Sequence, residues 1–151
     1  MWNIKNYRLG FDPWGLALFL AVMLPNLIWF VWPAPNDILR APSVTPLIDA
    51  IAQVFQIVMV AALCALVNVI RDKPVKRGFL AGTAVCVLLY YAGWAAYHVG
   101  ITNAAVILDL CLAPCGAFLI FALARKNGAA LISAGLFTIC HLIFAAANFL
   151  T

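Results

Sequence analysis

Five long apolar runs fill most of the chain, and they constrain its fold more than any other feature. They are Pro13–Trp32, Pro46–Ile70, Phe79–His98, Asn103–Ala124 and Ala129–Leu150. A helix needs about 20 residues to cross the hydrocarbon core of a bilayer, and each run reaches that length. The sequence therefore predicts an all-α, polytopic membrane protein with five transmembrane helices in one bundle.

The composition excludes a soluble protein. Of the 151 residues, 67% are hydrophobic and 9% are charged, and the mean hydropathy is +1.07. Soluble domains carry about 25% charged residues. The apolar runs leave no room for a separate soluble domain, so we expect one transmembrane domain over residues 1–151, with the lipid bilayer as its main surroundings.

The basic residues predict how the bundle is oriented. Of nine Lys and Arg residues, eight lie before the first run, between the second and third, or between the fourth and fifth, whereas the other two connections hold Arg40 alone. Basic loops stay on the cytoplasmic side. We therefore expect a cytoplasmic N-terminus, an extracytoplasmic C-terminus and a place in a bacterial cytoplasmic membrane. This topology explains the net charge of +4 better than a nucleic-acid partner does.

Prolines and cysteines fit the same interpretation. Pro13 and Pro46 suit the first turn of a helix, where the missing N–H costs nothing, and Thr45 is a candidate N-cap. Residues 1–11 mix aromatic and basic side chains, which favours a short segment lying at the cytoplasmic interface. The five cysteines all lie within apolar runs, and we interpret them as small apolar fillers rather than disulfide or redox pairs.

The polar residues inside the runs are the candidates for function. Placed by the predicted orientation, most of them fall in the extracytoplasmic half of the bundle. Asp49, Gln53 and Gln56 share one helix face, as residues spaced by three and four do. The candidate pocket residues are Asn26, Asp49, Gln53, Gln56, Trp94, His98, Asp109 and His141.

The free-energy cost of placing polar side chains in lipid is the reason to expect these groups to meet. Polar and ionisable side chains are expensive in lipid, so they face the bundle interior and pair with one another. Each also has a purely structural interpretation. Asp49 suits the first turn of a helix, the two glutamines can bond helices together, and His98 can be solvated at the headgroups. If the faces converge, they line a polar pocket open to the outside.

Two prolines lie beside these candidates. Pro25 and Pro114 each leave a backbone carbonyl one turn earlier without its helical donor, which predicts kinks at Asn26 and just after Asp109. The stretch WPAPNDILR is the only sizeable outer connection, and we expect it to form a rim over the pocket. Trp29 and Trp94 are candidates for an apolar wall, although an interfacial belt is the usual role of such residues.

The sequence does not point to a defined chemistry. Imidazole and carboxylate groups from His98, Asp109 and His141, with Asp49, could bind Zn²⁺, but no local motif supports that set and we expect no metal or other cofactor. Neither a nucleophile elbow nor a glycine-rich phosphate loop is present.

Two resemblances complete the sequence evidence. NYRLGFDPWGL, PAPNDILR and FTICHLIFAAANF resemble stretches in a group of short, uncharacterised multi-pass bacterial membrane proteins. WFVWPAP and AAANF are similar to features of the tryptophan-rich sensory/translocator (TSPO-type) family, which implies binding of tetrapyrroles or other apolar ligands. That family's longer Trp-Tyr, Lys-Pro-x-Trp and Pro-Pro pattern is absent here.

The leading hypothesis is an integral membrane protein whose outward-facing pocket binds, senses or transports a small, partly apolar molecule, without catalysis. Two alternatives stay open. One is an accessory or assembly subunit that meets a partner membrane subunit or a second copy of itself. The other is a metal-dependent membrane-embedded enzyme.

Overall fold

In the part of the chain that the structure describes, five helices that alternate in direction form a bundle. The structure is a computed structural model that describes residues 6–69 and 75–150. All five helices in this part of the chain are long and apolar enough to cross a membrane, as the sequence predicts. Their bounds are α1 Pro13–Val31, α2 Pro46–Ala65, α3 Arg77–His98, α4 Ala104–Ala124 and α5 Gly128–Phe149.

Capping residues mark the start of three of these helices. Asp12, Asn103 and Asn127 are N-caps whose side chains accept hydrogen bonds from the first free N–H groups of α1, α4 and α5, as short polar residues do at this position. Pro13 and Pro46 lie in the first turn as expected. Thr45 occupies the N-cap position of α2, but its side chain makes no capping bond.

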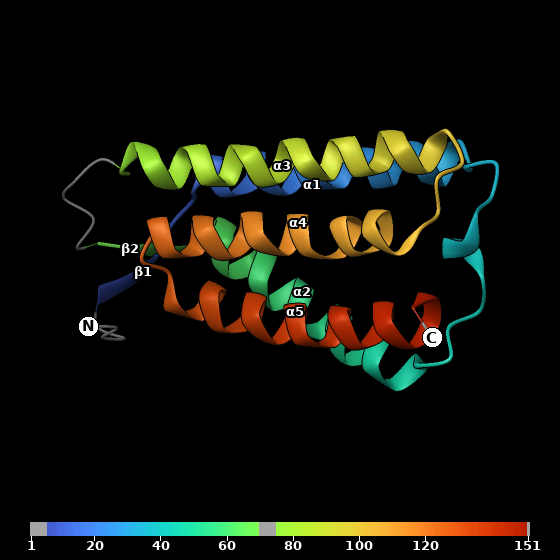
Figure 1. Ribbon diagram of the computed structural model, residues 1–151. Helices are drawn as coiled ribbons and strands as arrows, with labels where there is room; N and C mark the ends of the chain where they lie inside the picture. Colours follow the sequence, from blue (N-terminus) through green and yellow to red (C-terminus); the bar gives the residue numbers. More distant parts are fainter. Residues whose placement is uncertain (1–5, 70–74, 151) are drawn as a thin grey trace.

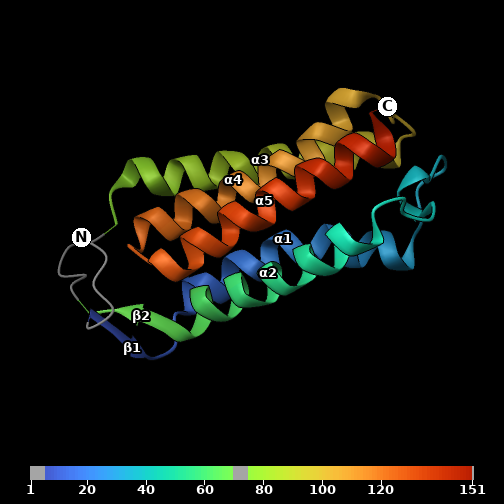
Figure 2. The same ribbon diagram turned by 90° about the horizontal axis from the view of Figure 1, so that it is seen from below.

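The helices form two layers. Figure 2 shows α3, α4 and α5 side by side in one layer, with α1 and α2 in the other. The helix α4 lies between α3 and α5 (Figure 1) and is the most buried of the five. Large aliphatic side chains are exposed on the outer faces of α1, α2, α3 and α5, as expected for helices in contact with lipid.

The two helices of the second layer touch at one end and separate toward the other. Gly15 packs so closely on α2 that an added Cβ would overlap the Leu63 carbonyl. From this contact α2 slants away from α1, and the two are well separated where α2 begins (Figure 1).

The second apolar run ends earlier as a helix than predicted. Instead of continuing to Ile70, which lies outside the described residues, α2 stops at Ala65 and the chain enters strand β2, Leu66–Asn68. This strand pairs antiparallel with β1, Tyr7–Leu9, in the register Tyr7↔Asn68. The expected interfacial segment is therefore, over these residues, one strand of a small sheet.

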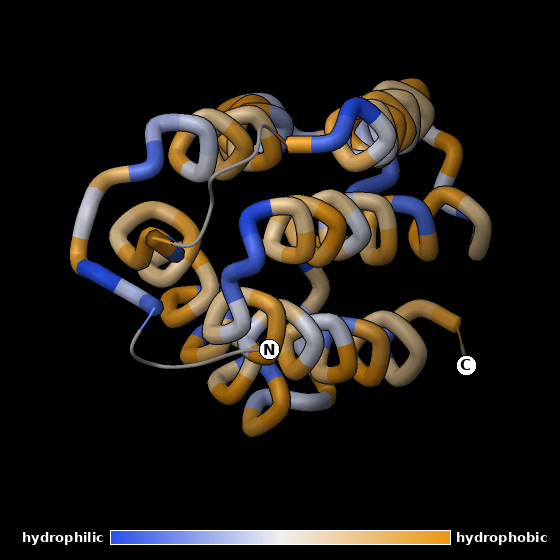
Figure 3. The backbone as a smooth tube through the Cα atoms, turned by 90° about the vertical axis from the view of Figure 1, so that its left-hand side faces the viewer, coloured by the Kyte–Doolittle hydropathy of each residue, from blue (hydrophilic) through white to orange (hydrophobic). Residues whose placement is uncertain are grey.

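This sheet marks what we call the basic end of the bundle, which also carries Arg8, Lys76, Arg77, Arg125 and Lys126. Figure 3 looks onto this end and shows hydrophilic connections in front of mostly hydrophobic helices. The Tyr7 hydroxyl donates to the Lys126 carbonyl at 3.0 Å and accepts from Gly128 N–H at 2.9 Å. The Asn127 amide donates to Ala62 O at 2.7 Å and to Leu66 O at 2.9 Å.

A buried ion pair joins the two layers here. Arg125 donates to Asp12 Oδ1 at 2.8 Å, and side-chain exposure is 8% for Arg125 and 9% for Asp12. Asp12 also accepts from Trp14 and Gly15 N–H at 3.1 and 3.4 Å. Multiple bonds of this kind offset the desolvation of two buried charges. Arg125, predicted only as a loop charge, therefore also ties the end of α4 to the start of α1.

Candidate functional site

A cavity of about 430 Å³ lies between the two layers, in the half of the bundle remote from the basic end. We call this half the distal half; it ends at the connections 32–45 and 99–103. The volume is in the range of small-molecule sites, about 300–1,000 Å³. All five helices contribute to its wall, and the connection after α1 adds Leu39.

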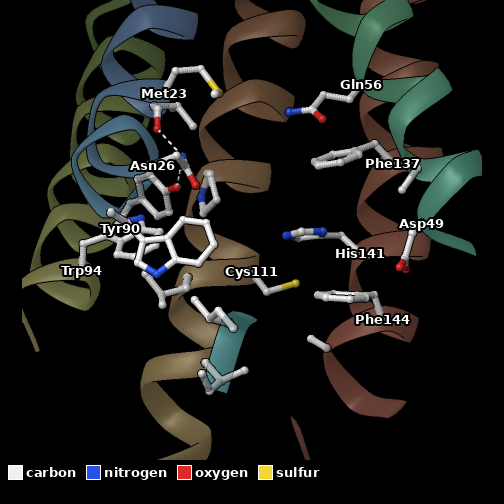
Figure 4. A pocket seen from close by; sticks show the side chains of 18 of the residues that line it. Met23, Asn26, Asp49, Gln56, Tyr90, Trp94, Cys111, Phe137, His141 and Phe144 are labelled. Atoms are coloured by element: carbon white, nitrogen blue, oxygen red, sulfur yellow. Dashed lines mark hydrogen bonds between the residues drawn. The ribbon is translucent and has the colours of Figure 1, made fainter. Parts of the chain in front are cut away.

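The cavity has two facing walls joined by α4. Figure 4 shows Asn26, Tyr90 and Trp94 on one side and Gln56, Phe137, His141 and Phe144 on the other, with Cys111 between them. Asp49 of α2 lies beyond His141, farther from the first wall. Six of the eight residues predicted for the pocket line this cavity: Asn26, Asp49, Gln53, Gln56, Trp94 and His141.

The hydrogen bonds around Pro25 position Asn26 of α1. Pro25 has no N–H, and the Ala21 carbonyl that it leaves unbonded accepts instead from the Tyr91 hydroxyl at 2.7 Å. Asn26 donates to Val22 O at 2.9 Å and to the Tyr90 hydroxyl at 2.7 Å. Both amide hydrogens are therefore used, and the Asn26 carbonyl oxygen remains as an acceptor at the cavity.

An aromatic stack holds His141. Its ring lies between Phe137, at 5.0 Å between centroids, and Phe144, at 6.0 Å, with interplanar angles of 23° and 17°. The spacing of four and three residues puts the three rings on one face of α5. Among the described residues His141 has no hydrogen-bond partner, and its ring points into the cavity (Figure 4).

The polar face of α2 is almost free of protein partners. Asp49 accepts one hydrogen bond, from the Thr45 hydroxyl at 3.1 Å. Neither Gln53 nor Gln56 has a hydrogen-bond partner within the described chain, although both line the cavity. The glutamines therefore do not bond helices together in this protein, and their amides stay available to a bound molecule or water.

Hydrogen bonds to Asp37 hold the connection after α1 at the distal end of the bundle. Asp37 accepts from Trp29 Nε1 at 3.0 Å, from Tyr97 Oη at 2.9 Å and from Arg40 Nε at 2.8 Å. Arg40 also lies over the Trp29 ring at 4.9 Å. Because Leu39 of this segment lines the cavity, the connection forms part of the rim, as the sequence predicts.

Two predicted residues lie outside the cavity wall. The His98 Nδ1 hydrogen-bonds to Trp94 O at 2.9 Å, and its other ring nitrogen is buried without a partner in the described residues. Asp109 packs against α3, where its Oδ2 occupies the space that a side chain at Gly93 would fill. The structure therefore does not bring His98 and Asp109 together with His141. In the described ranges no three His, Cys, Asp or Glu side chains group as metal ligands.

Several lining residues were not predicted. Tyr90 lies one turn before Trp94, and Phe137 and Phe144 flank His141 at helical spacing. The signal was present, because residues three or four apart share a face with the polar group they flank. Asp37 belongs to the stretch WPAPNDILR, which was predicted only as a rim, whereas its carboxylate accepts hydrogen bonds from three side chains.

The fold and the cavity together define the class: a multi-pass helical membrane protein with a pocket between its helices. Comparison with known proteins does not narrow this class. No protein-family model, no curated protein and no solved structure matches the chain. The resemblances drawn from its sequence therefore remain expectations.

Proposed function

We propose that this protein binds a small, partly apolar molecule in the distal cavity, as a sensor, binding protein or transporter of that molecule. The observation that carries the proposal is the cavity itself, where Gln53, Gln56 and His141, which have no hydrogen-bond partner in the described part of the chain, face an aromatic wall from α1 and α3. Buried polar groups are normally hydrogen-bonded. Gln56 and His141 are half-buried in the lining and have no hydrogen-bond partner among the described residues, so they gain most from a ligand that brings donors or acceptors together with apolar surface.

The orientation of the cavity follows from the charges. Five basic residues of the described chain gather at the basic end, and Arg40 lies at the other. By the positive-inside rule the basic end is cytoplasmic. The distal cavity then opens toward the outer half of the membrane, in a bacterial cytoplasmic membrane. Gln53 of α2 is both exposed and part of the lining, which favours access to the cavity from the lipid beside this helix.

Thermal unfolding with a compound panel tests the proposal. A ligand at about 100 times its Kd stabilises the folded state by about 2.7 kcal/mol, which raises the unfolding temperature measurably. We expect some small aromatic amphiphiles to stabilise the wild-type protein in detergent. Ala145→Met should remove this effect, because Ala145 lines the cavity and is 3% exposed.

Ala146→Met is the matched control. Ala146 is the next residue on α5, is exposed and lies outside the lining. Its variant adds the same side chain without filling the cavity, and it should respond to ligand like the wild type. Equal responses of the Ala145 and Ala146 variants to every stabilising compound would show that binding occurs elsewhere.

A further inference from the structure

The cavity has an unbalanced charge. Its lining includes the carboxylate of Asp49 and no lysine or arginine. Arg40, at the same end of the bundle, lies outside the lining and pairs with Asp37, with its Nε 2.8 Å from the Asp37 carboxylate. A guest molecule would therefore meet a negative charge without a compensating positive one.

Asp49 retains capacity for a further partner. Its Oδ1 accepts from Thr45 Oγ1 at 3.1 Å, and among the described residues it forms no ion pair. The side chain is half-buried in the first turn of α2, where the helix N-terminus favours negative charge. A carboxylate at the edge of an apolar cavity interacts more strongly with a cation than one in water does.

The rest of the wall suits a cation with an apolar body. Trp29, Tyr90 and Trp94 lie on one side and the Phe137–His141–Phe144 stack on the other. Aromatic faces carry negative charge density and attract cations, most strongly quaternary ammonium groups in aromatic surroundings. The same rings supply apolar surface for a hydrocarbon or aromatic group.

We propose that the ligand of this cavity is a hydrophobic monovalent cation, an organic amine or quaternary ammonium compound with an aromatic or alkyl body. This inference rests on the proposed function and deepens it. The positive group lies toward Asp49, and the apolar body lies between the two aromatic walls. An anionic amphiphile is disfavoured by Asp49, and a neutral one leaves that carboxylate without a counter-charge.

Matched probes of one shape test the charge preference. Benzyltrimethylammonium is the cation, neopentylbenzene is its neutral carbon counterpart, and benzyl sulfonate is an anion of similar size. We expect the wild-type protein, purified in a non-ionic detergent, to bind the cation at least about 10-fold more tightly than either other compound, a difference of about 1.4 kcal/mol. Calorimetric titration measures all three affinities.

Three variants test whether Asp49 causes the preference for the cation. Asp49→Asn should bring the affinities for cation and neutral probe to within about 3-fold of each other, since the shape is kept and the charge removed. Asp49→Glu should retain a cation preference. Asp109→Asn is the control, because it removes a carboxylate of α4 that lies outside the lining, and it should bind the cation as the wild type does.

The outcomes separate this inference from the proposed function. Equal binding of cation and neutral probe by the wild type overturns the cation proposal and leaves the proposed function standing, as does a preference that survives in Asp49→Asn. Absence of cation binding likewise overturns it, whatever the compound panel shows. If in addition no compound of the panel distinguishes Ala145→Met from Ala146→Met, the proposed function fails as well.

Discussion

The absence of a side chain at Gly93 determines where the Asp109 carboxyl lies. Gly93 of α3 leaves a space against α4, and the Asp109 carboxyl fills it, with Oδ2 buried. The carboxyl is thereby directed to the α3–α4 contact and away from the cavity. The small residue and the acid form one structural unit, although they are 16 positions apart in the chain.

Gly93→Ala tests this unit. The new methyl would overlap Asp109 Oδ2 and come within 3.3 Å of Leu110 Cδ2, and such overpacking costs about 1–3 kcal/mol. We expect the variant to unfold more readily in a detergent titration. Adding Asp109→Ala should restore part of the loss by vacating the space.

Gly135→Ala provides the comparison for that experiment. Gly135 lies within α5, and an added Cβ meets nothing within 4 Å. Since alanine is the better helix former by about 1 kcal/mol, this variant should be as stable as the wild type or more so. A Gly93 variant that behaves like the Gly135 variant would contradict the proposed contact.

The position of a polar residue along the bundle could be predicted from the sequence. The neighbouring helix that its side chain faces could not always be predicted. Asn26 and His141 face the cavity as expected, since their helices have a lipid-facing side that leaves one inward direction. In contrast, α4 is apolar all round and is covered by α3 and α5. No stripe on such a helix indicates which neighbour a polar side chain meets. Asp109 therefore lies in the distal half of α4, but its carboxyl is directed to α3 and not into the cavity.

At the scale of one element, α1 shows how a broken helical bond is replaced. Pro25 cannot donate to the Ala21 carbonyl, and a carbonyl unbonded in lipid is costly. The Tyr91 hydroxyl of α3 donates to it at 2.7 Å. The next residue on α3, Tyr90, accepts from Asn26 at 2.7 Å. The segment of α1 around Pro25 is thus bonded to two adjacent tyrosines of α3.

A double-mutant cycle measures this replacement. Tyr91→Phe should lower the free energy of unfolding by about 1–2 kcal/mol, because it leaves the Ala21 carbonyl without a donor. Pro25→Ala supplies an N–H that can bond the same carbonyl. The cost of Tyr91→Phe should therefore be smaller in the Pro25→Ala background. Equal costs in both backgrounds would show that the tyrosine acts only through packing.

The end of α2 illustrates what hydropathy cannot distinguish. The run from Pro46 stays apolar through Leu66 and Val67, which predicts a longer helix. Those residues instead pair with Tyr7–Leu9, and Gly10 N–H donates to Ala65 O at 3.0 Å. Apolar composition suits either conformation. The choice depends on a partner strand far away in the chain, which no local pattern reveals.

At the scale of the whole molecule, most of the basic residues lie at the end opposite to the cavity. The basic end carries the sheet and the Asp12–Arg125 pair, whereas the polar lining of the cavity lies in the distal half. This separation was predictable, because loop charge and helix length together give each residue a depth. The helix neighbours that close the cavity were not, since they depend on packing between helices distant in sequence.

Reporter fusions test the resulting orientation in a bacterial host. With the basic end cytoplasmic, alkaline phosphatase fused after Leu150 should be active and green fluorescent protein at that site dark, since the first folds only outside and the second only inside. The same reporters placed after Lys126, between α4 and α5, should give the reverse result. Activity of the phosphatase at Lys126 and fluorescence at Leu150 would invert the topology and make the cavity face the cytoplasmic half of the bilayer.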